Sequence, residues 1–397
     1  MIGRGNDDEY TLRVAWTAHR GAIDTAPAEA KDYLLRLLPG VKYSMTDSSP
    51  DVILFMSGGS ERRAIELSAT ERPVLLLAIR GNNAYAAATE VMAWMVNHNR
   101  IAVLSDAVDA AESGLIDRWR ISAGVWEKIN GARAGLIGTV SEWLVASDVS
   151  AETMRKRFGV ELAGVPWKEL PDFSNEEPDT GLLNRFRGQD PDGLEDAARV
   201  LTLLRRVISD GNLSALGVEC FSLVQERRVT ACLALAQLNA EGIVAACEGD
   251  LASMAGMMAG KALTGRVPWM ANTTLLTDTT LILSHCTAPF DFVSDVELPS
   301  HYETGWSLAV DGRINASEVT LFRFSDTLDR VFIAGGRVKG RPRLTNACRT
   351  QVEITLPRDA IKALKERPLG NHLLMLEGDH SENMRLACRY RGIEVIV

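Results

Sequence analysis

The segment Cys247-Glu248-Gly249-Asp250 places two carboxylates around a glycine, between an apolar strand pattern and a helical pattern. Two carboxylates at such a turn can face a hard cation, and the glycine lets the backbone bend close to it. Asp250 also stands where a helix N-cap belongs, which is the structural alternative. The two interpretations are compatible, because Glu248 would bind the cation while Asp250 caps the helix.

Two histidines stand at the ends of apolar runs. His372 opens the run Leu373–Leu376, and it is either a ligand for Mn²⁺, Fe²⁺ or Zn²⁺ or a hydrogen-bonded core residue. His285 precedes Cys286, but neighbouring strand residues point to opposite faces, which argues against a cysteine hydrolase. His285 therefore either lines a cleft that binds sugar hydroxyls or is an interior histidine.

The order of these motifs resembles the L-fucose isomerase and L-arabinose isomerase superfamily, and more closely its shorter fucose-isomerase-like members. The resemblance extends from Val218 to the end of the chain, and the N-terminal block is consistent with the first domain of that superfamily. It rests on Cys232, Leu238-Asn239, Gly242-Ile243, Cys247-Glu248-Gly249-Asp250, Leu263-Thr264-Gly265, His285-Cys286, Gly370-Asn371-His372 and Gly378-Asp379.

The resemblance implies an aldose–ketose isomerase that uses a divalent cation, usually Mn²⁺, and an enediol intermediate. In that superfamily two acidic side chains and a histidine hold the metal, and the carboxylates move a proton between C1 and C2. Glu248 matches the first acid, as metal ligand and acid/base group, and His372 matches the histidine. These matches predict a metal site that contains both residues.

The second acidic ligand of the superfamily falls on Asn272, which is the main departure from the pattern. An amide oxygen can coordinate a metal, but it carries no charge and cannot accept a proton. Asp278, Asp250 and Glu219 are the candidate substitutes, although none of them matches the motif. We expect Asn272 or one of these carboxylates, with Asp278 foremost, to complete the catalytic site.

Other polar and aromatic groups could complete a sugar site. Asn371, His301 and Trp306 suit hydroxyl binding or ring stacking, and their structural alternatives are a turn amide, a surface imidazole and a core indole. Members of the superfamily assemble as trimers or hexamers in which a neighbour's first domain covers the cleft. The resemblance therefore implies a homo-oligomer in which Arg80 and Asn82 reach another subunit's substrate; otherwise they form an ordinary strand–helix turn.

Composition and net charge argue against some classes of binding partner. The formal net charge is −9, from 43 Lys and Arg against 52 Asp and Glu, which disfavours nonspecific binding to nucleic acid or anionic membranes. The six cysteines show no zinc-type spacing, and no run reaches the roughly 18 apolar residues of a membrane span. With an acidic N-terminus in place of a signal peptide, we expect a cytoplasmic protein with a small-molecule sugar as its partner.

Hydrophobic periodicity predicts an α/β protein with three domains. Residues 1–160 alternate short apolar runs, Ala134–Gly138 among them, with amphipathic helices such as Ala107–Ser122, which indicates a doubly wound parallel domain. Residues 161–267 repeat that alternation as a second α/β domain. Residues 268–397 contain short strands, including Ser307–Val310, and predict an antiparallel, barrel-like β domain.

Three functions fit these patterns. The first is a metal-dependent sugar isomerase of the L-fucose/L-arabinose isomerase type. The second is a catalytically altered or non-catalytic carbohydrate-binding relative, because Asn272 replaces an acid. The third is an NAD(P)-dependent oxidoreductase, which the missing glycine fingerprint in the N-terminal block disfavours.

Overall fold

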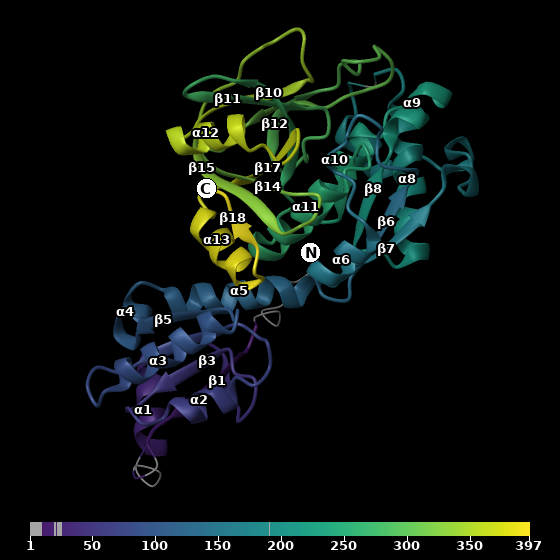
Figure 1. The fold of residues 1–397 in the computed structure, drawn as a ribbon. Coiled ribbons are helices and arrows are strands. Elements are labelled where there is room, and N and C mark those ends of the chain that lie inside the picture. The colour runs from purple at the N-terminus through teal and green to yellow at the C-terminus, as the bar shows by residue number, and fades with distance from the viewer. Residues whose placement is uncertain (1–9, 20, 22–25, 190) are drawn as a thin grey trace. The chain divides into compact units, whose positions relative to one another are not determined.

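The computed structural model describes the whole chain except residues 1–9, 20, 22–25 and 190 (Figure 1). The chain forms two compact units, residues 1–127 with 386–392 and residues 128–385 with 393–397. Within the described residues, no helix is both long and apolar enough to cross a membrane. The three-domain boundaries expected from the sequence stay a prediction.

The first unit contains a parallel sheet in the strand order β2-β1-β3-β4-β5, as the doubly wound prediction requires. Every residue of β3 and β4 is buried, which explains their continuous apolar sequences. The strands are β1 (Leu12–Thr17), β2 (Tyr43–Met45), β3 (Val52–Phe55), β4 (Val74–Ala78) and β5 (Ala102–Asp106). The helices are α1 (Ala26–Leu37), α2 (Glu61–Leu67), α3 (Ala84–Asn97), α4 (Ala107–Glu112) and α5 (Leu115–Ile129).

Two expectations for this part of the sequence are wrong. The predicted helix Ala107–Ser122 is divided into α4 and α5, because Gly114 adopts a φ of 70°, outside the helical region. The predicted strand Ala134–Gly138 is present, but it pairs in a second parallel sheet instead of the first. Periodicity identifies a buried parallel strand without specifying the sheet that contains it.

That second sheet has the order β7-β6-β8-β9 and belongs to the second unit. Its strands are β6 (Arg133–Ile137), β7 (Glu161–Val165), β8 (Ala215–Val218) and β9 (Val244–Cys247). The accompanying helices are α6 (Ala151–Phe158), α7 (Thr180–Arg185), α8 (Leu194–Gly211), α9 (Cys220–Arg227), α10 (Cys232–Ala240) and α11 (Leu251–Thr264). Helix α11 follows β9 directly and packs against the barrel strands β14 and β17.

A closed antiparallel barrel of six strands forms the rest of the second unit and confirms the predicted fold class. Pairing of β14 with β15 closes the order β14-β17-β10-β11-β16-β15, and β18 adds to β15 in parallel. The barrel strands are β10 (Trp269–Leu276), β11 (Thr280–His285), β14 (Glu318–Phe324), β15 (Arg330–Gly340), β16 (Thr350–Thr355) and β17 (His372–Glu377). The remaining elements of the chain are β12 (Val293–Glu297), β13 (Asp311–Ile314), β18 (Glu394–Val395), α12 (Arg358–Glu366) and α13 (Ser381–Tyr390), whose last residues, from 386 on, are part of the first unit.

The barrel contains one strand that the sequence patterns missed and lacks one that they predicted. Strand β10, which carries Asn272, lies between β11 and β17. The predicted strand Ser307–Val310 is instead a loop with a single isolated bridge from Leu308 to Ser300, because no neighbouring strand continues the pairing. At one end of the barrel, Asn272 stands opposite both Ser284 and His372.

Candidate metal centre

Glu248 lies on the turn between β9 and α11, and its backbone adopts a left-handed φ of 58°. Such a conformation is unusual for a residue with a side chain and is often found at functional sites. Gly249 follows with a φ of 64°, and a Cβ atom there would collide with the carbonyl oxygen of Thr139. The turn therefore requires glycine at position 249 and holds the Glu248 backbone in a strained conformation.

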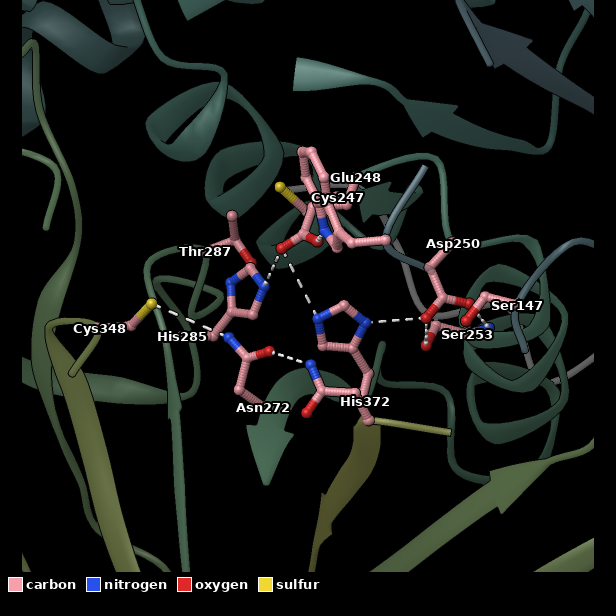
Figure 2. Close-up of polar contacts among 12 residues, drawn as sticks. Ser147, Cys247, Glu248, Asp250, Ser253, Asn272, His285, Thr287, Cys348 and His372 are labelled. Atoms are coloured by element: carbon pink, nitrogen blue, oxygen red, sulfur yellow. Dashed lines mark hydrogen bonds and ion pairs between the residues drawn. The ribbon is translucent and has the colours of Figure 1, made fainter. Parts of the chain in front are cut away.

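Asp250 caps helix α11, which confirms the structural interpretation of this residue. Its Oδ1 atom accepts a hydrogen bond of 2.7 Å from the Ser253 backbone N–H. Its Oδ2 atom accepts from the guanidinium of Arg323, at 2.8 Å, and from Nδ1 of His372, also at 2.8 Å. Asp250, Arg323 and His372 are all buried, so the carboxylate is the centre of an enclosed polar network. Figure 2 shows its contacts with His372 and Ser253.

His372, the first residue of β17, has a fixed orientation. A carboxylate can only accept, so Nδ1 carries the proton that it donates to Asp250. In the neutral form of the imidazole, Nε2 then has a free lone pair. That Nε2 atom lies 3.7 Å from Oε1 of Glu248, beyond hydrogen-bond distance, and has no hydrogen-bond partner among the described residues. In metal-ligating histidines, the ring nitrogen that does not bind the metal typically donates a hydrogen bond to a carboxylate, as Nδ1 of His372 does here.

His285, the last residue of β11, approaches the same oxygen. Its Nδ1 atom is hydrogen-bonded to Oγ1 of Thr287 at 2.9 Å, and its Nε2 atom lies 3.8 Å from Oε1 of Glu248. This second Nε2 atom is also buried without a hydrogen-bond partner in the described structure. Figure 2 shows both imidazoles turned toward the Glu248 carboxylate.

Glu248, His285 and His372 each offer one ligand atom, and these atoms lie within 4.8 Å of one another. One carboxylate oxygen and two imidazole nitrogens are a donor set that suits Mn²⁺, Fe²⁺ or Zn²⁺. Buried imidazole nitrogens without partners are costly, and a cation between them would supply the missing interaction. The group could therefore hold a metal ion.

The electrostatics of the centre follow from burial and close opposite charges. Burial raises the pKa of Glu248, but the two imidazoles outweigh burial and lower it far below its ordinary value. Burial also raises the pKa of Asp250, and Arg323 and His372 reverse that effect. For His372, burial lowers the pKa, whereas the two carboxylates raise it to about 9; for His285, burial dominates and lowers it.

Asn272 lies beside this group but is not a member of it. Its Oδ1 atom accepts a hydrogen bond of 2.6 Å from Nδ2 of Asn371, and its Nδ2 atom lies 3.9 Å from Sγ of Cys348 (Figure 2). The two predicted site residues Asn272 and Asn371 therefore form a pair at the end of the barrel. The pair follows from the register that places Asn272 opposite His372.

The proposed substitutes for Asn272 lie elsewhere. Asp278 is in the turn between β10 and β11, at the opposite end of that hairpin from Asn272, with 95% of its side chain exposed. It pairs with Lys365 at 2.6 Å. Glu219 caps helix α9 by accepting from the Ser222 backbone N–H at 3.0 Å. The structure brings neither carboxylate into the Glu248 group.

His301 and Trp306 lie in the loop between β12 and β13. His301 is buried, and its Nε2 atom lies 3.3 Å from Oε2 of Glu303; burial lowers the pKa of His301 to about 4. Partial burial and the charge of Glu248 raise the pKa of Glu303, although 41% of its side chain is exposed. Sequence patterns give no signal for this residue. Trp306 is 38% exposed, with the guanidinium of Arg228 at 4.5 Å above its ring.

Arg80 and Asn82, in the first unit, follow β4 at the carboxyl end of the strand. Arg80 forms ion pairs with Asp106, at 3.2 Å, and with Asp109, at 2.7 Å. Asn82 adopts a left-handed φ of 51° and lines a cleft with Ser57. Their predicted contact with another subunit's substrate stays a prediction.

Trp143 is the contact of Glu248 that sequence patterns missed. Its indole N–H donates a hydrogen bond of 2.7 Å to Oε2 of Glu248, from a loop 105 residues earlier in the chain. No motif around Trp143 signals this role, because the contact depends on the pairing of β6 with β8 and of β8 with β9.

The fold and site thus define an α/β-plus-barrel protein with a buried carboxylate–imidazole centre.

Comparison with known proteins is consistent with a sugar isomerase. No protein-family model matches the chain. The chain is 24% identical over 238 residues to a sulfoquinovose isomerase of Alkalicoccus urumqiensis, covering 57% of this chain and 53% of that protein. It is 22% identical over 293 residues to the sulfoquinovose isomerases of Priestia aryabhattai and Priestia megaterium, covering 69% of this chain and 66% of each relative. The chain thus spans between half and two thirds of the length of these relatives, which are sugar isomerases by name.

Proposed function

We propose that this chain is a divalent-metal-dependent aldose–ketose isomerase of the L-fucose/L-arabinose isomerase type. The sulfoquinovose isomerases to which it is similar suggest sulfoquinovose, or an aldose of similar structure, as the substrate. The order of motifs around Glu248 and His372 supports the same class. The predicted assembly into trimers or hexamers and the cytoplasmic location belong to this proposal.

One observation carries the proposal: two buried Nε2 atoms, neither with a hydrogen-bond partner among the described residues, converge on one oxygen of Glu248. In an interior without a cation, this arrangement leaves two imidazole nitrogens unsatisfied. Glu248, His285 and His372 would hold the metal, so His285 joins the two ligands expected from the sequence. When bound, the cation would act as a Lewis acid that polarises the carbonyl of the open-chain sugar.

Metal binding and proton transfer are assigned to different side chains. A carboxylate whose pKa is strongly lowered is a weak base, so Glu248 serves best as a ligand. Asn272 cannot accept a proton. Glu303 has the opposite tendency, because partial burial of its side chain, 41% of which is exposed, and the charge of Glu248 raise its pKa. Such a carboxylate is better suited to take a proton from C2 and return it to C1. We therefore assign proton transfer to Glu303.

The amide at position 272 supports a second candidate function. If Glu303 does not reach the sugar, the described part of the chain offers the site no carboxylate free for proton transfer, and the protein would bind a carbohydrate without isomerising it. Asn272 and Asn371 would then contribute hydroxyl contacts, since each amide offers both donors and an acceptor.

Metal analysis and a ketose assay test the proposal. We expect the purified protein to bind about one Mn²⁺ per chain, and to convert sulfoquinovose, or an aldose in a panel with L-fucose and L-arabinose, to its ketose. Glu248→Gln and His285→Gln should each lose metal and activity, whereas Asp278→Asn, a control at an exposed ion pair, should retain both. Binding of sugar without turnover would favour the second candidate, and retention of metal by both site variants would contradict the proposed centre.

A further inference from the structure

Trp143 lies in the loop that joins β6 to α6, and this loop contacts the metal centre at several points. The Ser141 backbone N–H donates to the carbonyl oxygen of Glu248 at 3.0 Å. Further along, the Ser147 hydroxyl accepts from the guanidinium of Arg323 at 2.8 Å. The loop is therefore anchored on both sides of Trp143, to the residue that offers the metal ligand and to the network behind His372.

The ring of Trp143 is fixed by a second contact. It packs edge-to-face against Phe221 of α9, with ring centroids 4.8 Å apart and planes at 79°. Its side chain is nevertheless 48% exposed, a high value for an indole whose N–H bonds to a buried carboxylate. Burial of the ring in a core does not explain this placement, whereas the hydrogen bond to Glu248 does.

The bond gives the two oxygens of Glu248 different environments. Oε2 accepts from Trp143 at 2.7 Å, while Oε1 faces the Nε2 atoms of His285 and His372. A glutamate carboxylate rotates easily about its last side-chain bond, because that torsion has a broad, roughly two-fold profile. A donor on one oxygen restricts this rotation and leaves the other oxygen directed at the imidazoles.

We propose that Trp143 is a positioning residue for Glu248, whose indole N–H holds the carboxylate with Oε1 directed at His285 and His372. The consequence for metal affinity rests on the proposed function. The orientation itself does not, since it follows from the hydrogen bond between the Trp143 indole and Oε2 of Glu248.

The first test observes the hydrogen bond directly. In protein labelled with ¹⁵N-tryptophan, the eight indole N–H signals can be recorded, and Trp143→Phe identifies the one that belongs to Trp143. A hydrogen bond to a carboxylate shifts the proton signal downfield, so Glu248→Gln should move the Trp143 signal upfield. A Trp143 signal that is the same in wild type and Glu248→Gln would overturn the proposal.

The second test measures Mn²⁺ affinity by calorimetry. Trp143→Phe keeps an aromatic ring beside Phe221 and removes only the N–H, so we expect about 10-fold weaker binding, the usual effect of losing an outer partner of a ligand. Trp167→Phe is the matched control, because its indole N–H donates at 3.0 Å to the Glu219 backbone carbonyl instead. It should bind Mn²⁺ as the wild type does.

The two tests separate the two proposals. If the wild type binds no Mn²⁺ but the Trp143 signal responds to Glu248→Gln, the proposed function fails and the positioning role stands. If the wild type binds Mn²⁺ and Trp143→Phe binds it equally well, the positioning role is overturned and the proposed function stands.

Discussion

Substitutions in the buried ion pair of Asp250 and Arg323 should lower the free energy of unfolding of the second unit strongly. We consider Asp250→Asn, which preserves shape and removes the charge. The carboxylate accepts from Arg323 and His372 at Oδ2 and from the Ser253 backbone N–H at Oδ1. Whichever oxygen becomes an NH₂ group, it faces a donor, and the fully buried guanidinium loses its counter-charge.

The size of the effect follows from this geometry. Leaving one member of a buried ion pair without its partner costs about 3–5 kcal/mol of unfolding free energy. Arg323→Met removes the stranded charge while keeping much of the side-chain length. The double variant Asp250→Asn/Arg323→Met should therefore be less destabilised than the sum of the two single variants, by about 1–3 kcal/mol.

Urea unfolding of metal-free protein in EDTA, followed by circular dichroism, measures these free energies. Hydrogen exchange of peptides from β14 and β17 assigns the change to the second unit. Asp278→Asn is the matched control, because it makes the same chemical change at an exposed pair with Lys365, and we expect no measurable effect. A loss below about 1 kcal/mol for Asp250→Asn, or additive single variants, would refute the reasoning.

Three further predictions concern the same unit. The folded-state pKa of His372 is raised from 6.5 to about 9, so its contribution to stability is complete below about pH 6.5 and is lost as the pH rises through about 9. Urea unfolding of metal-free protein should show a loss of about 3 kcal/mol across this range, absent in His372→Gln. Glu303→Gln should lower kcat by about 100-fold with unchanged Mn²⁺ affinity, and an equal loss of affinity would argue against proton transfer. Gly249→Ala should lower stability by about 1–3 kcal/mol and by more than Gly242→Ala, which shares a positive φ but has open space around it, as thermal unfolding can check.

Much of the candidate site could be predicted from short stretches of the sequence. A carboxylate at a strand–helix turn and a histidine that opens a strand are short-range signals, so the sequence predicts Glu248 and His372 as site residues, and the structure places them together. The cap at Asp250 was predicted for the same reason and is confirmed. For His285 the sequence predicts either a cleft that binds sugar hydroxyls or an interior position, and its approach to Oε1 of Glu248 follows only from the place of β11 in the barrel.

The sequence by itself determined the α/β alternation, the parallel N-terminal sheet, the antiparallel barrel-like end and the turn that carries Glu248. These features follow from hydrophobic period, turn residues and caps, all of which act within a few positions of the chain. The tertiary structure alone decided that β6 pairs with β8, that β14 closes on β15 and that Trp143 meets Glu248. Those contacts join residues far apart in sequence, and their register depends on side-chain packing across whole sheets, which no local pattern specifies.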